Sequence, residues 1–169
     1  VNFSTTATGG TVTYAWTNSN TTIGLSASGS GNIASFTATN NGTAPVTATI
    51  AVMPTFTNNG VSCQGTAQTF TITINPTATV NAISNQTVCN GAAVSAVNFA
   101  TSATGGTITY AWTNSNSSIG LAASGTGNIA SFTATNNTNA TVTATITVTP
   151  TFTNGAVSCV GTSTTFTIT

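Results

Sequence analysis

Apolar and polar side chains alternate with a period of two along most of this chain. The clearest run is TVTATITVTPTFT at residues 141–153, where threonine occupies every second position. Strict alternation of this kind predicts a β-strand with one buried face and one solvated face. The buried face would carry Val142, Ala144, Ile146, Val148 and Phe152.

Three other segments in the second half of the chain alternate in the same way. They are TITYAWT at 107–113, NIASFTAT at 128–135 and TFTIT at 165–169. Turn-forming glycine and asparagine residues separate these segments, and no segment has a helical period. Short strands with turns about every ten residues predict an all-β, immunoglobulin-like antiparallel sandwich.

The sequence also repeats itself after 96 residues. Residues 1–73 align with residues 97–169 without a gap, and 56 of the 73 aligned positions are identical. A period of this length suits one small β domain. We therefore predict two tandem domains, residues 1–75 and 76–169. Their cores would include the matched aromatic pairs, Tyr14 with Tyr110 and Trp16 with Trp112.

The junction between the copies contains Pro76, which cannot donate to a strand ladder. The last strand of the first copy should therefore end near it, and so short a linker predicts domains placed end to end. The second copy has residues 77–96 ahead of Val97, and these supply its first strand. The first copy starts at the equivalent of Val97, so we expect its sheet to have an open edge. A preceding repeat of the same polypeptide, or a neighbouring chain, would fill that edge.

The composition excludes several classes of function. The chain contains 43 threonines but no Asp, Glu, Lys, Arg or His. Without cations it has nothing to neutralise phosphates, so we expect no nucleic-acid partner. No apolar run reaches the ~18 residues of a spanning helix, so we expect no membrane insertion. Without carboxylates or histidines we expect no metal site and no cofactor.

Catalysis is excluded on the same grounds. General acid–base chemistry uses His, carboxylates, Lys, Tyr or Cys, and the first three are absent. Cys63, Cys89 and Cys159 have no histidine or cation nearby in the sequence to form a thiolate. The sequence therefore predicts a protein that is not an enzyme.

One set of residues resembles a known family. It comprises two Cys-x-Gly motifs, a Tyr-x-Trp motif and two glycine-containing turns: Cys89-Asn90-Gly91, Tyr110 and Trp112, Ile119-Gly120-Leu121, Gly125-Thr126-Gly127-Asn128-Ile129, and Cys159-Val160-Gly161. The set resembles the PKD-like repeat of very large secreted surface proteins of Bacteroidota, including gliding-associated adhesins exported by the type IX route. PKD domains proper follow Tyr-x-Trp with a Phe-Gly-Asp-Gly turn. This chain has Thr-Asn-Ser-Asn there, so no role of the acidic turn is carried over.

The resemblance implies an extracellular, cell-surface location and a pairing of the cysteines. Each complete repeat would hold two cysteines, which favours a Cys89–Cys159 disulfide within the second copy. Cys63 would then pair with a cysteine upstream of Val1. Spacing alone leaves open a Cys63–Cys89 bond across the domain junction.

We therefore expect a structural stalk or filament module of a long extracellular bacterial surface protein. Its partners would be neighbouring repeats of the same chain or identical chains, with any surface glycan bound at a tip outside this sequence. One alternative is a carbohydrate-binding or adhesive module, which requires exposed aromatic side chains. The other is an ice-binding surface, which requires a flat array of threonines.

Overall fold

The computed structural model describes all 169 residues, and the chain folds as two compact units, Val1–Ile74 and Asn75–Thr169. Both units are built from antiparallel β-sheets, and the only helical elements are two 3-10 turns, Thr21–Ile23 and Ser117–Ile119. The predicted all-β, antiparallel fold is confirmed. No helix is long and apolar enough to cross a membrane. We call Val1–Ile74 unit 1 and Asn75–Thr169 unit 2.

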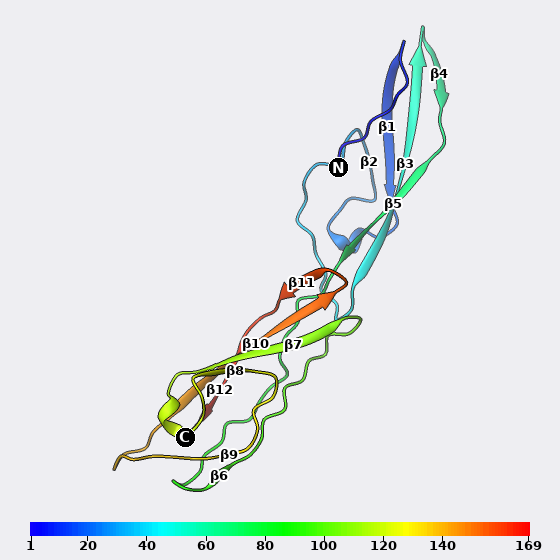
Figure 1. The fold of residues 1–169 in the computed structure, drawn as a ribbon. Coiled ribbons are helices and arrows are strands. Elements are labelled where there is room, and N and C mark those ends of the chain that lie inside the picture. The colour runs from blue at the N-terminus through cyan, green and yellow to red at the C-terminus, as the bar shows by residue number, and fades with distance from the viewer. The chain divides into compact units, whose positions relative to one another are not determined.

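Unit 1 has one five-stranded sheet organised around a single long strand. Its strands are β1 (Thr11–Asn18), β2 (Ser28–Ser30), β3 (Val46–Asn58), β4 (Val61–Gln64) and β5 (Gln68–Ile74). β1 lies between β2 and β3 and pairs with both of them. The other side of β3 pairs first with β5 and then with β4 (Figure 1).

Unit 2 repeats this sheet and adds a short second one. The repeated strands are β7 (Thr107–Asn114), β8 (Ser124–Thr126), β10 (Ala144–Asn154), β11 (Val157–Val160) and β12 (Thr164–Ile168). The additional sheet pairs β6 (Ala93–Val94) with β9 (Phe132–Thr133). Figure 1 shows β7 and β10 as the long central pair of this unit.

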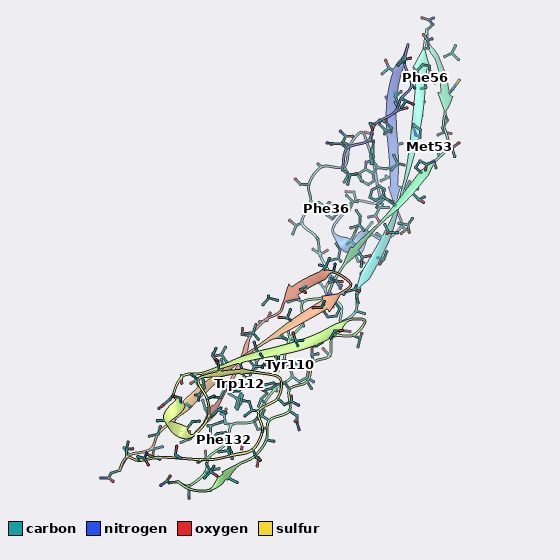
Figure 2. The ribbon with its side chains drawn as sticks, viewed as in Figure 1. Phe36, Met53, Phe56, Tyr110, Trp112 and Phe132 are labelled. Atoms are coloured by element: carbon teal, nitrogen blue, oxygen red, sulfur yellow. The ribbon has the colours of Figure 1, made fainter.

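The alternation read from the sequence corresponds to burial in β10. Ala144, Ile146, Val148 and Phe152 are buried, and the threonines between them are exposed or partly exposed. Trp112, on β7, belongs to the same core, and Tyr110 packs against it while partly buried (Figure 2). The core of unit 1 is arranged in the same way, with Trp16 buried and Tyr14 partly buried.

One predicted strand is mostly absent. Of NIASFTAT at 128–135, only Phe132–Thr133 forms a strand, and residues 32–40 of unit 1 form none. The reason lies in hydrogen bonding, because alternation can place side chains on one face without supplying a ladder partner. β9 has only the two residues of β6 as its partner, and unit 1 contains no counterpart of β6.

The repeated Asn-Ser-Asn after each tryptophan builds the turn that follows the strand. Asn114 is buried, and its Nδ2 donates to the carbonyls of Leu121 (3.0 Å) and Ala122 (3.2 Å). Its Oδ1 accepts from the backbone N–H of Asn116 (3.0 Å). Ser115 Oγ accepts from the N–H of Thr145, at 2.8 Å. Unit 1 makes the same bonds from Asn18 and Ser19.

Candidate strand-binding groove

Unit 1 has an apolar groove of about 420 Å³ beside β5. Residues 1–5 line one part of it and residues 68–70 of β5 line another, together with Tyr14, Val52 and Pro54. A second hollow of about 270 Å³ shares Thr5 and Pro54 with the first and extends past Phe56 and Cys63. Both hollows are lined mainly by residues of the repeat that have equivalents in unit 2.

In unit 2 the equivalent space is occupied by the start of the unit itself. Ala78 and Val80 are buried in it, and Pro76 is fully buried. The backbone N–H of Asn81 donates to the carbonyl of Ala100 (2.8 Å), and that of Thr162 donates to the carbonyl of Ala78 (3.0 Å). Residues 76–88, which we call the leading segment, therefore fill the groove of unit 2.

The leading segment runs parallel to β12. Gln86 is the parallel bridge partner of Ile168. Its N–H donates to the carbonyl of Thr167 (3.0 Å), and its carbonyl accepts from the N–H of Thr169 (2.9 Å). The N–H of Val88 then donates to the carbonyl of Thr169 (2.9 Å). A sheet edge that would otherwise be bare is thus paired.

The corresponding edge of β5 in unit 1 has no partner. Thr71 and Thr73 are the equivalents of Thr167 and Thr169, and no hydrogen bond is formed by their backbone groups on that side. Thr49, opposite Thr71, directs its own N–H and C=O to Ser19 on the far side of β3. Thr49 and Thr71 are therefore a non-hydrogen-bonded pair of the antiparallel ladder. The backbone N–H and C=O of Thr71 point away from β3, toward the open edge of the sheet.

The missing coverage is visible in the core of unit 1. Phe70 and Ile72 are only partly buried, whereas their equivalents Phe166 and Ile168 are 2% and 1% exposed. Such a combination of apolar surface and unpaired backbone at a sheet edge is a template for pairing with another strand.

The threonine faces, by contrast, are satisfied within the sheets. Hydroxyl groups bond across strands, as between Thr47 and Thr73 (2.8 Å) and between Thr149 and Ser163 (2.8 Å). Further pairs join Thr57 with Ser62 and Thr153 with Ser158. Cross-strand hydroxyl pairing stabilises a sheet, which accounts for these threonines without a ligand.

The tryptophans are enclosed and offer no stacking surface. Trp16 and Trp112 are each 7% exposed, and the indole N–H of each has no hydrogen-bond partner. A glycine lies against each ring, Gly29 against Trp16 and Gly125 against Trp112, and a Cβ at either position would overlap the ring. These side chains therefore belong to the core, as the sequence predicts.

The cysteines do not form the expected disulfide. All three are free thiols, so neither Cys89–Cys159 nor the alternative Cys63–Cys89 bond is present. Cys159 pairs with Phe152 near the end of β10. Cys89 follows Val88, which bonds to Thr169 beside Thr143, just before β10 begins.

The distance between the two ends of β10 explains why the prediction was wrong. The nine Cα-to-Cα steps from 143 to 152 span roughly 30 Å of extended chain, far more than the ~7 Å that a disulfide allows between Cα atoms. The leading segment runs parallel to β12 and so carries Cys89 to the opposite end of the unit from Cys159. Two cysteines that belong to the same repeat are therefore not close to each other in the fold.

The electrostatics of both units are simple, because no side chain is charged at neutral pH. The one resolved perturbation is at Tyr110, where burial raises the pKa of the hydroxyl above its usual value of 10.0. No side chain that lines the groove carries a charge that could attract or repel a partner. Recognition there depends on shape, apolar contact and backbone hydrogen bonds.

Part of this site is predictable from the sequence. The absence of a counterpart to residues 77–96 in the first copy predicts an open edge, but no sequence pattern identifies Thr71 and Thr73 as the exposed backbone. The sequence pattern also gives no role to the Asn-Ser-Asn motif, whose Asn114 is 8% exposed and holds the turn. The available signal is an Asn-Ser-Asn motif that stands two residues after each buried tryptophan and is identical in both copies.

These features define an all-β protein of antiparallel sheets in which one sheet edge is open in unit 1 and covered in unit 2. Neither the protein-family models nor the curated proteins compared with this chain give a match.

Proposed function

We propose that the chain is a structural module of a long extracellular bacterial surface protein, an adhesin stalk or a fibre. In this proposal repeats of the same type follow one another lengthwise and act as mechanical spacers. Their neutral polar faces are available for lateral contact with other repeats. The resemblance to PKD-like repeats of secreted surface proteins supports the location.

The observation that carries the proposal is that the residues shared by both copies are used for folding. The paired tryptophans are buried, the paired glycines lie against them, and Asn18 and Asn114 hold the turns. The threonine hydroxyls bond to one another across strands. A module whose repeated residues serve its own stability is suited to a structural role.

Arrays of different length test this proposal. Residues 74–169, one full period, are joined head to tail in two, four and six copies, and the maximum dimension is measured by small-angle X-ray scattering. An 11-residue strand such as β10 spans roughly 36 Å. We expect the maximum dimension to increase by about that length with each added copy.

A matched set of arrays provides the control. A flexible Gly-Ser linker inserted after Ile74 of each copy should make the maximum dimension grow more slowly, roughly with the square root of copy number. If the arrays without the linker behave like those with it, or collapse into compact particles, the spacer function is refuted.

A further inference from the structure

We propose that the groove of unit 1 binds an additional copy of residues 76–96, joined directly ahead of Val1 as residues 76–96 are joined ahead of Val97. The inference rests on the proposed function only in taking the chain to be one of several repeats. The occupant is thus an extended, uncharged segment with small aliphatic side chains facing inward. It would lie parallel to β5, as the leading segment lies parallel to β12.

The backbone of unit 1 supplies the matching hydrogen-bonding groups. In unit 2 the segment uses the N–H and C=O groups of Thr167 and Thr169 and the carbonyl of Ala100. The equivalents in unit 1 are Thr71, Thr73 and Ser4, whose corresponding groups have no partner. An added segment would therefore form the same ladder without displacing an existing bond.

The side-chain space also matches. In unit 2 the carbonyl of Ala78 lies so close to Gly161 that a Cβ there would overlap it. At the equivalent Gly65 the atoms nearest to such a Cβ all belong to Pro54. The place that a second Ala78 would occupy is therefore open. Val80 and Ala78 of the added copy would cover Phe70 and Phe56, which are only partly buried now.

A second pairing zone lies further along the same segment. In unit 2 the N–H of Ala134 donates to the carbonyl of Ala92 (2.8 Å), and the N–H of Gly91 donates to the carbonyl of Ala134 (2.9 Å). The equivalent of Ala134 in unit 1 is Ala38, which is exposed and lies outside any strand. Binding of the added copy would convert residues 36–37 into the counterpart of β9.

A second molecule of this chain is a poorer source of the segment. Its own residues 76–88 already occupy unit 2, where Ala78 and Val80 are 0% and 6% exposed. Donating them would empty one groove in order to fill another, with no net gain in buried area or hydrogen bonds. A segment that precedes Val1 in the same polypeptide has no such competing site.

Hydrogen exchange measured by NMR tests the proposal on the full chain. The native 169 residues are compared with a lengthened chain that carries residues 76–96 ahead of Val1, with Cys89→Ser in the added copy. We expect exchange at the amides of Thr71, Thr73 and Ala38 to slow by at least about 100-fold in the lengthened chain. The equivalent amides of Thr167, Thr169 and Ala134 serve as the internal reference for a filled groove.

Two substitutions in the added copy distinguish specific docking from a general effect of extra chain. Val80→Asn places an amide at a buried position and should abolish the protection. Thr79→Asn changes a neighbouring exposed position and should leave it intact. Equal protection with both variants, or no protection in the lengthened chain, overturns the inference.

Sedimentation of the native chain separates the remaining occupants. If Thr71 and Thr73 are already protected and the chain is a dimer, a second molecule fills the groove and the inference is wrong. If they are protected in a monomer, the edge is closed by unit 1 itself and the inference is also wrong. The two proposals can fail separately. If the arrays described above do not lengthen but the lengthened chain is protected from exchange, the spacer function is refuted and the groove inference is supported.

Discussion

Replacing Asn114 with alanine should strongly destabilise unit 2. The change removes two donated hydrogen bonds, to the carbonyls of Leu121 and Ala122, and one accepted from the N–H of Asn116. A typical protein hydrogen bond contributes about 1 kcal/mol net, and a buried group left without its partner costs more. The three together correspond to a loss of about 2–4 kcal/mol, a large part of the stability of a small domain.

Urea and thermal unfolding are both followed by tryptophan fluorescence in a Trp16→Phe background, so that Trp112 alone reports on unit 2. The thermal midpoint should fall by roughly 10–30 °C, given about 4–8 °C per kcal/mol for a domain of this size. Asn137→Ala is the matched control, because Asn137 is exposed and forms no hydrogen bond through its side chain. A loss below about 0.5 kcal/mol, the range of ordinary surface changes, would refute the assigned role of Asn114.

An aspartate at position 114 tests the direction in which stability changes with pH. Asn114→Asp keeps the acceptor oxygen, loses the donor and places the only acidic side chain of the protein in a buried site without a cation. Burial raises the pKa of such a carboxyl above its unfolded value of ~3.9. The folded state then binds more protons, so this variant should be most stable below about pH 4 and lose stability as the pH rises through the folded pKa.

Three further results are expected. Gly125→Ala forces a methyl group against the ring of Trp112 and should lower the free energy of unfolding, measured in urea, by about 1–3 kcal/mol or more. Ser124→Ala, at the exposed position before it, should lower it by less than about 0.5 kcal/mol. The unfolding midpoint of the unmodified chain should be flat from about pH 4 to 8. It should then fall above about pH 10 as Tyr110, whose pKa is raised, loses its proton, and Tyr110→Phe should reduce that fall; a steep acid transition would contradict this account. Under mild oxidation, peptide mapping should find no Cys89–Cys159 bond in the folded monomer, and finding one would show that the leading segment is misplaced.

Local patterns in the sequence were sufficient for most of the strands. Alternation determines which face of a strand is apolar, and the face of β10 that carries Ile146 and Val148 is buried as predicted. The repeat extended this reading to unit 1, where β3 buries Ile50 and Val52 in the same way. Burial of Trp112 followed from its place on an alternating strand.

Hydrogen bonds between residues far apart in the chain cannot be predicted from local alternation. The leading segment alternates only over residues 76–80, and most of its residues belong to no strand element, yet it bonds to residues more than 80 positions away, at Thr167 and Thr169. The misplacement of Cys89 follows from this, because the direction of the segment is a tertiary feature. Asn114 was missed for a different reason. Asparagine usually marks an exposed turn, and only the surrounding carbonyls make it a buried residue.

The direction of the leading segment determines how unit 2 carries tension. The chain enters this unit at Asn75 and continues to Thr169, so a pull along the polypeptide acts on the start of the segment and on the end of β12. The two run parallel, and opposite forces therefore slide one past the other. In this shear geometry the bonds of Gln86 and Val88 to β12 and Thr169 are loaded together rather than opened one by one. A copy of residues 76–96 bound in the groove of unit 1 would load β5 in the same shear geometry.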